Sequence, residues 1–223
     1  MNEKERPIVL PGEFLSEREG KKIGDNVYEE NGKVFSKVIG IPKITETEIS
    51  VIALSGKYIP KVGDRVIGTI IDVEVSGWFV DINSPYIAFL PLGEAVEEFV
   101  DTSRVDISKY YDVNEVIFCR ISKVTKNKIV QVSMHDLHAK KLIGGVLVKI
   151  TPSKVPRVIG KGGSMINLIK NKTGCELIVG QNGVIWIKGK NKSKAIEAIL
   201  LIEKESHIIG LTEKVETVSY THL

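Results

Sequence analysis

The chain has 223 residues, enough for one to three domains with buried cores. Its composition, with 43% hydrophobic and 26% charged residues, is that of a globular protein, and no apolar run approaches the ~20 residues of a membrane span. The net charge of +3 is uneven, because residues 141–215 carry 13 Lys/Arg against 5 Asp/Glu whereas residues 1–140 are slightly acidic. This composition argues against a membrane protein and indicates a polyanion as the partner of the basic last third.

Residues 1–56 predict a small N-terminal β-domain of about four strands. Pro11-Gly12 and Asn31-Gly32 are turn pairs, and the second lies between NVYEE and KVFSKVIGI as a hairpin turn would. Four strands are too few to close a barrel alone. We therefore expect this domain to need a neighbouring sheet edge or a partner surface.

Residues 57–138 predict a five-stranded OB-fold barrel. The expected strands are Arg65–Val75, Trp78–Ile82, Ile87–Leu92, Glu115–Val124 and Ile129–Met134. The connection between the third and fourth strands is long, acidic and partly helical in its period, which is the layout of an OB fold. Its acidic stretch, residues 94–106, should point away from RNA or toward another protein.

Residues 139–215 predict an α+β domain in the order βααββα, and residues 216–223 predict a tail. The expected elements are a strand at 145–150, helices at 152–159 and 164–173, strands at 175–179 and 184–188, and a helix at 193–206. Pro156 must lie in the first turn of its helix or end it. The whole chain is thus a multidomain protein, mainly β plus α+β.

The sequence motif that indicates ligand binding is VIGKGGSMI, between the two predicted short helices. Glycines let the turn approach a ligand closely, and the following helix presents unpaired N–H groups and the positive end of its dipole. Lys161 adds a mobile cation. A GxxG loop of this kind clamps about four nucleotides in KH domains. A P-loop fits poorly, because no Lys-Ser/Thr follows the glycines and no long parallel sheet precedes them, and a Rossmann fingerprint fails for the same reason.

The sequence offers no catalytic constellation, so we expect no catalytic residue, no metal site and no cofactor. The histidines at 135 and 138 flank Asp136 in the one metal-like spacing, but a third ligand is missing, and we interpret the run as a linker turn. Cys119 and Cys175 have no partner at ligand spacing and predict two buried, reduced thiols. Together with an N-terminus that lacks a long apolar run, they indicate a cytoplasmic protein.

Two further segments, VGDRVIGTI and SGWFVDI, resemble the S-one type of RNA-binding OB domain, named from a ribosomal protein. With the KH segment after it and a β-domain opening VLPGEFL before it, the chain resembles an RNA-binding cap subunit of the archaeal exosome, of the ribosomal-RNA-processing protein four family. The resemblance covers about residues 7–210. Bacterial polynucleotide phosphorylase carries the two modules in the opposite order, with two catalytic domains that are absent here.

The resemblance implies a non-catalytic subunit that recruits single-stranded RNA to a phosphorolytic 3′-to-5′ exoribonuclease ring. Three copies would sit on a hexameric ring of subunits, with the S-one domains around the entrance to its channel. The N-terminal β-domain would supply much of the contact with the ring. A ribosome- or translation-associated RNA binder built from the same modules is the alternative, and the mass of the natural complex would separate the two.

The barrel departs from the S-one pattern at several positions. Phe79 matches one of the family's paired aromatics, but Ser76 occupies the other position, Pro91 replaces a histidine and Thr125 replaces an aspartate. The barrel is therefore expected to read RNA loosely, by charge and shape.

Burial preference places Trp78 in the core, whereas Phe89 could face core or solvent. The predicted RNA-binding residues are Arg157, Gly160, Lys161, Gly162 and Gly163 in the KH domain, and Phe79, Arg120, Lys123, Lys126 and Lys128 on the barrel.

Overall fold

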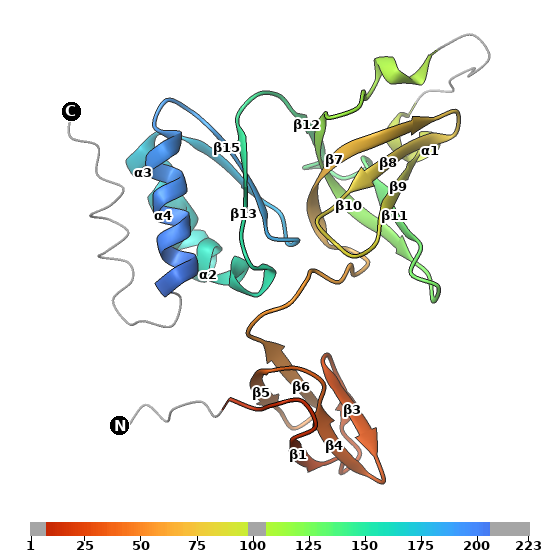
Figure 1. The fold of residues 1–223 in the computed structure, drawn as a ribbon, viewed down its shortest axis with the longest axis vertical. Coiled ribbons are helices and arrows are strands. Elements are labelled where there is room, and N and C mark those ends of the chain that lie inside the picture. Colours follow the sequence, from red (N-terminus) through yellow and green to blue (C-terminus); the bar gives the residue numbers. More distant parts are fainter. Residues whose placement is uncertain (1–7, 98–105, 206–223) are drawn as a thin grey trace. The chain divides into compact units, whose positions relative to one another are not determined.

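The computed structural model describes residues 8–97 and 106–205, which fall into two compact units, Met1–Gly56 and Lys57–Leu223 (Figure 1). Most of the acidic stretch at residues 94–106 and the predicted tail at 216–223 lie outside the described residues. Within the described ranges, no helix has the length and apolar character to cross a membrane.

The N-terminal unit contains six strands, so the prediction of about four was wrong. They are β1 (Phe14–Glu17), β2 (Lys22–Ile23), β3 (Val27–Glu30), β4 (Lys33–Ser36), β5 (Gly40–Ile44) and β6 (Glu48–Ala53). They form two three-stranded sheets, in the orders β1-β4-β3 and β2-β6-β5. The Asn31-Gly32 hairpin is confirmed, because it joins β3 to β4 with both residues at positive φ.

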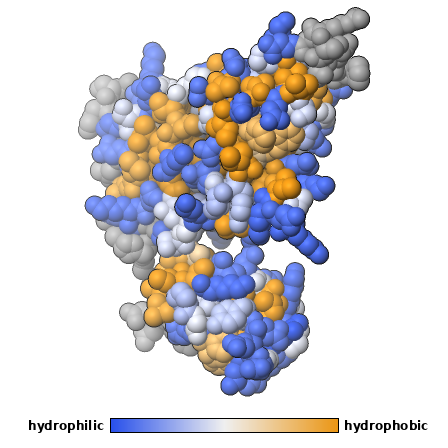
Figure 2. Space-filling model, turned by 45° about the vertical axis from the view of Figure 1, so that its right-hand side comes forward, coloured by the Kyte–Doolittle hydropathy of each residue, from blue (hydrophilic) through white to orange (hydrophobic). Residues whose placement is uncertain are grey.

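A small core of valines and one isoleucine holds the N-terminal unit together. Its members are Val9, Val27, Val34, Ile49 and Val51. Other large apolar side chains are about half exposed, and Figure 2 shows orange surface on this unit among blue side chains. They are Ile8, Leu10, Phe14, Ile39, Ile44 and Ile52. The unit therefore buries few apolar side chains and leaves many available to a partner.

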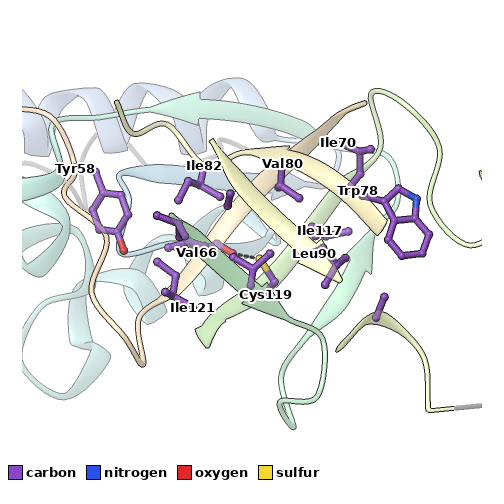
Figure 3. Packing of buried hydrophobic residues seen from close by; sticks show 14 of the residues in the cluster. Tyr58, Val66, Ile70, Trp78, Val80, Ile82, Leu90, Ile117, Cys119 and Ile121 are labelled. Atoms are coloured by element: carbon purple, nitrogen blue, oxygen red, sulfur yellow. Dashed lines mark hydrogen bonds between the residues drawn. The ribbon is translucent and has the colours of Figure 1, made fainter. Parts of the chain in front are cut away.

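The barrel is closed by five strands, as predicted. They are β7 (Arg65–Glu74), β8 (Gly77–Asp81), β9 (Ala88–Pro91), β10 (Val116–Val124) and β11 (Val130–Ser133), each end within one residue of its predicted position. Their order is β11-β9-β8-β7-β10, and pairing of β10 with β11 closes the ring. Successive side chains along a strand point to opposite faces of the sheet, so residues such as Trp78, Val80 and Leu90 point into one shared core (Figure 3). Burying each such side chain contributes roughly 1.5–3 kcal/mol.

The long connection between β9 and β10 contains the short helix α1 (Leu92–Ala95) and a 3₁₀ turn at Ile107–Lys109. A sixth strand, β12 (Lys140–Leu142), follows the barrel and pairs with β10. It was not predicted, because two of its three residues are lysines and the pattern shows no apolar alternation.

The remaining described elements form the predicted βααββα domain. They are β13 (Val146–Lys149), α2 (Val155–Ile159), α3 (Ser164–Thr173), β14 (Glu176–Val179), β15 (Val184–Lys188) and α4 (Lys192–Glu205). The antiparallel sheet has the order β13-β15-β14, and its core joins Leu177, Ile185 and Ile187 to the apolar faces of the helices. Pro156 lies in the first turn of α2, as predicted.

A second apolar cluster joins the KH domain to the barrel. Ile67 of β7, Leu142 of β12 and Trp186 of β15 are buried together, and the indole Nε1 of Trp186 donates to the carbonyl of Gly144 at 2.7 Å. The KH sheet therefore carries apolar side chains on two faces, one against its own helices and one against the barrel. This shared cluster is why residues 57–205 form a single compact unit.

Asn182, in the turn between β14 and β15, makes a buried hydrogen-bonded link between the two domains. Strand β7 pairs with β8 only from Thr69 onward, so its first residues have a free edge on that side. The buried Asn182 amide pairs with this edge: its Nδ2 donates to the carbonyls of Ile67 and Ile82, both at 2.8 Å, and its Oδ1 accepts from the N–H of Ile67 at 3.3 Å. A side-chain amide thus replaces the missing strand.

Candidate nucleic-acid interface

The predicted GxxG loop is a tight turn between α2 and α3, built on three glycines in positive-φ conformations. Gly160 has φ 74° and ψ 172°, a region that essentially only glycine adopts, and a Cβ there would lie 2.7 Å from the backbone nitrogen of Met165. Gly162 and Gly163 are left-handed, and a Cβ on Gly162 would meet nothing within 4 Å. Gly160 therefore closes the turn, whereas Gly162 faces open space where a ligand backbone can approach.

Positive charge gathers at this loop. Gly163 is the N-cap of α3, and no side chain caps the helix, so the positive end of its dipole is not neutralised by a carboxylate. Lys161 and Arg157 are exposed. Neither forms an ion pair with any residue in the described ranges. The loop, the helix end and the two cations suit a sugar–phosphate backbone.

The apolar neighbours of the loop hold the two helices in place. Val158 is fully buried, and Ile159, Met165 and Ile166 are partly buried against the same core. Their partial exposure leaves an apolar surface beside the loop, which is the expected floor for bases.

On the barrel, strand pairing aligns side chains of five strands into one outward-facing row. Lys123 of β10 lies opposite Gln131 of β11, Gln131 opposite Phe89 of β9, Phe89 opposite Phe79 of β8, and Phe79 opposite Asp72 of β7. The rings of Phe79 and Phe89 are 5.3 Å apart and half-buried. Phe89 therefore faces outward and not into the core. It lies beside Phe79 as a second outward-facing aromatic ring, although Ser76 occupies the position where the family usually has one.

The other predicted barrel residues lie near the Lys123 end of this row, on β10 and in the turn after it. Arg120 is opposite Arg65 and Ser133, and a bulge in β10 separates it from Lys123. Lys126 and Lys128 lie in the turn between β10 and β11, where Lys128 has a left-handed backbone. All four cations are exposed, and none has an ion-pair partner in residues 8–97 and 106–205. The row therefore combines two aromatic faces, each worth ~1–3 kcal/mol when a base stacks on it, with cations for phosphates.

Trp78 packs in the core, as predicted. Its side chain is fully buried, its Nε1 donates to the carbonyl of Tyr111 at 2.7 Å, and the two rings meet edge to face. A stacking role for Trp78 is therefore excluded by burial.

The HDLH run is a turn, as predicted. Asp136 accepts from the N–H of His138 at 3.0 Å and pairs with Arg65 at 3.2 Å, and these contacts lower the pKa of Asp136. The described residues contain no group of three or more His, Cys, Asp or Glu side chains that could hold a metal. Both cysteines are buried and unpaired, as predicted, and burial raises the pKa of Cys119 to about 12.

An OB-fold barrel joined to a KH domain, each with a cationic surface, defines a class of proteins that bind single-stranded nucleic acid. Three family descriptions match the chain: the N-terminal domain of the exosome RNA-binding protein RRP4 at residues 6–55, the S1 domain of RRP4 at 57–123, and a KH domain at 145–193. The chain belongs to the Rrp4 family of exosome complex components.

Curated relatives support this membership over nearly the whole chain. The exosome complex component Rrp4 of Pyrococcus horikoshii is 43% identical over 98% of this chain and 84% of its own length. That of Methanothermus fervidus is 44% identical over 96% of this chain and 95% of its own. A crystal structure described as an exosome complex RNA-binding protein matches with a TM-score of 0.69 at 32% identity, covering 74% of this chain and 95% of the other.

Proposed function

We propose that this chain is the non-catalytic RNA-binding cap subunit of an archaeal exosome in the cytoplasm. It binds single-stranded RNA through the GxxG loop and the row on the barrel, and guides it to the channel of a phosphorolytic 3′-to-5′ exoribonuclease ring. The observation that carries the proposal is that both surfaces belong to one compact unit, fixed to each other by Asn182 and the cluster around Trp186. A single strand can therefore contact both without a flexible linker between them.

Phosphate contacts on the barrel predict a strong dependence of RNA affinity on salt. Changing Arg120, Lys123 and Lys126 together to Gln should flatten the slope of log affinity against log salt by about 2, because each lost phosphate contact on a single strand removes ~0.7. The slope is measured by fluorescence anisotropy with the full chain.

A matched control removes the same charge elsewhere. Lys22, Lys37 and Lys43 are exposed lysines of the N-terminal unit, and their change to Gln should leave the slope nearly unaltered. Equal slopes for both triple variants would remove the barrel surface from the binding site.

We further propose that the N-terminal unit contacts the ring, with three copies of the chain on each hexamer. The half-exposed apolar side chains of this unit support the proposal, since such side chains are typical of a surface that a partner covers.

Changing Ile44 and Ile52 to Glu should prevent assembly with purified ring subunits, because carboxylates would then be buried in the contact. Both side chains are half exposed, so the unit should still fold. Native mass spectrometry checks the assembly, and RNA affinity of the free chain should stay unchanged. A variant that still forms the full complex would place the ring contact elsewhere.

A further inference from the structure

A groove of about 670 Å³ lies where the barrel meets the KH domain. Phe118 of β10 and the segment Leu137–Lys140 after β11 line one side, and Lys170 of α3 with Glu176 of β14 line the other. The volume is in the range of sites for small ligands, which run from roughly 300 to 1,000 Å³. The groove is distinct from both the GxxG loop and the aromatic row.

Leu137 and His138 of the HDLH turn line this groove. The side chain of Leu137 is 99% exposed. The turn is held by Asp136, which accepts from the N–H of His138, forms an ion pair with Arg65, and accepts from the N–H of Ala139 through its carbonyl. Leu137 is thus fixed in place without being covered.

The charge of the groove suits a phosphate. Lys140 pairs with Glu176 at 3.2 Å, but both side chains are half exposed, so this pair is weak and can be exchanged. Lys170 is half-buried and has no ion-pair partner in the described part of the chain. The lining carries more cations than anions, beside apolar surface from Leu137 and Phe118. A nucleotide matches both parts, because the faces of its base can contact apolar side chains while its phosphate contacts a cation.

The groove also lies within reach of a strand held at the loop. Lys170 is on the helix that begins beside the GxxG loop, six residues after Ser164, which is about 9 Å along the axis. β14 is an edge strand of its sheet, so its outer N–H and C=O groups are open to hydrogen bonds from a ligand.

We propose that this groove binds one nucleotide of the same single-stranded RNA, with a phosphate at Lys140 and Lys170 and the base against Leu137 and Phe118. The proposal rests on the proposed function, in which the loop holds the backbone of that RNA. It adds the turn after the barrel to the RNA path, which neither domain provides alone.

The test compares two RNA lengths on the full chain. Changing Leu137 to Ser and Lys170 to Gln together should weaken binding of an RNA of about ten nucleotides by about fivefold or more, through loss of one phosphate contact and one apolar contact. An RNA of about four nucleotides, the length that a GxxG loop clamps, should bind as before. The matched control changes Leu200 to Ser and Lys204 to Gln, an exposed pair on α4 that does not line the groove.

A photocrosslinking measurement with 4-thiouridine in the longer RNA gives a second readout, and the crosslinked peptide should include Leu137 or His138. Unchanged affinity for the longer RNA and no crosslink in this segment would overturn the proposal, as expected if the groove serves a protein partner. The proposed function would still stand if changes in the GxxG loop weakened both RNAs. Equal melting temperatures of the variants and the wild type show that folding is intact.

Discussion

Changing Lys161 and Gly162 together to Asp should lower the affinity of the free chain for single-stranded RNA about ten- to a hundredfold, since a charge-assisted contact is worth ~1.5–3 kcal/mol. Two carboxylates would then occupy the place of a phosphate at the loop. The domain should remain folded, because Lys161 is exposed and a side chain at Gly162 meets nothing within 4 Å. Asp also tolerates the left-handed backbone of Gly162 better than most residues.

The matched control changes both Lys161 and Gly162 to Asn. Asn has the shape of Asp and the same tolerance of the left-handed backbone, so both variants carry equal strain and differ in charge alone. The control should lose less affinity than the Asp variant, and the difference measures repulsion of the phosphate. Equal affinity of all three proteins, with equal melting temperatures, would make the loop a structural turn.

The same variants can also be compared after assembly with the ring subunits. If RNA enters the complex mainly past the barrels, the Asp variant will lose affinity as a free chain and keep much of it when bound to the ring. The comparison of free and assembled affinities therefore measures how much of the RNA path the KH loop supplies.

The barrel strands and the GxxG loop could be predicted because their signals are local. The run of β-branched residues along Arg65–Glu74 and the spacing of Gly160 and Gly163 are visible within a few residues. The short strand at Lys22–Ile23 and the lysine-rich strand at Lys140–Leu142 carry no such pattern, and both were missed.

Long-range contacts were missed for a different reason. The short gap at residues 180–183 between two predicted strands indicates a hairpin turn, but the partners of Asn182 lie about a hundred residues earlier in the chain. The outward position of Phe89 was likewise unresolved, because an aromatic in a short apolar strand fits either face until its neighbours are known. Local patterns therefore predicted each domain, but the contacts between the barrel and the KH domain could be found only in the structure.

The contacts of Asn182 between the barrel and the KH domain predict a large effect on stability. Changing Asn182 to Ala should lower the free energy of unfolding of the barrel–KH unit by about 2–4 kcal/mol, because buried backbone groups of Ile67 and Ile82 lose their partner and each unsatisfied group costs ~1–3 kcal/mol. Urea unfolding followed by tryptophan fluorescence measures it. The chain has two tryptophans, Trp78 in the barrel core and Trp186 in the cluster between the domains, so fluorine NMR of the fluorotryptophan-labelled chain reports both places separately without removing either side chain.

The neighbouring Gln181 provides the control for this change. Its side-chain oxygen accepts from the N–H of Arg65 at 2.7 Å, but the contact is exposed, so water can replace it. Gln181→Ala should therefore lower the free energy of unfolding much less than Asn182→Ala does. In the wild type, both tryptophans should report a single transition, since the cluster around Ile67 and Trp186 is shared by the two domains. In Asn182→Ala, the signal of Trp186 should change at lower urea than that of Trp78. Coincident transitions and a stability equal to that of Gln181→Ala would mean that the apolar cluster alone joins the domains and that the buried amide contributes little.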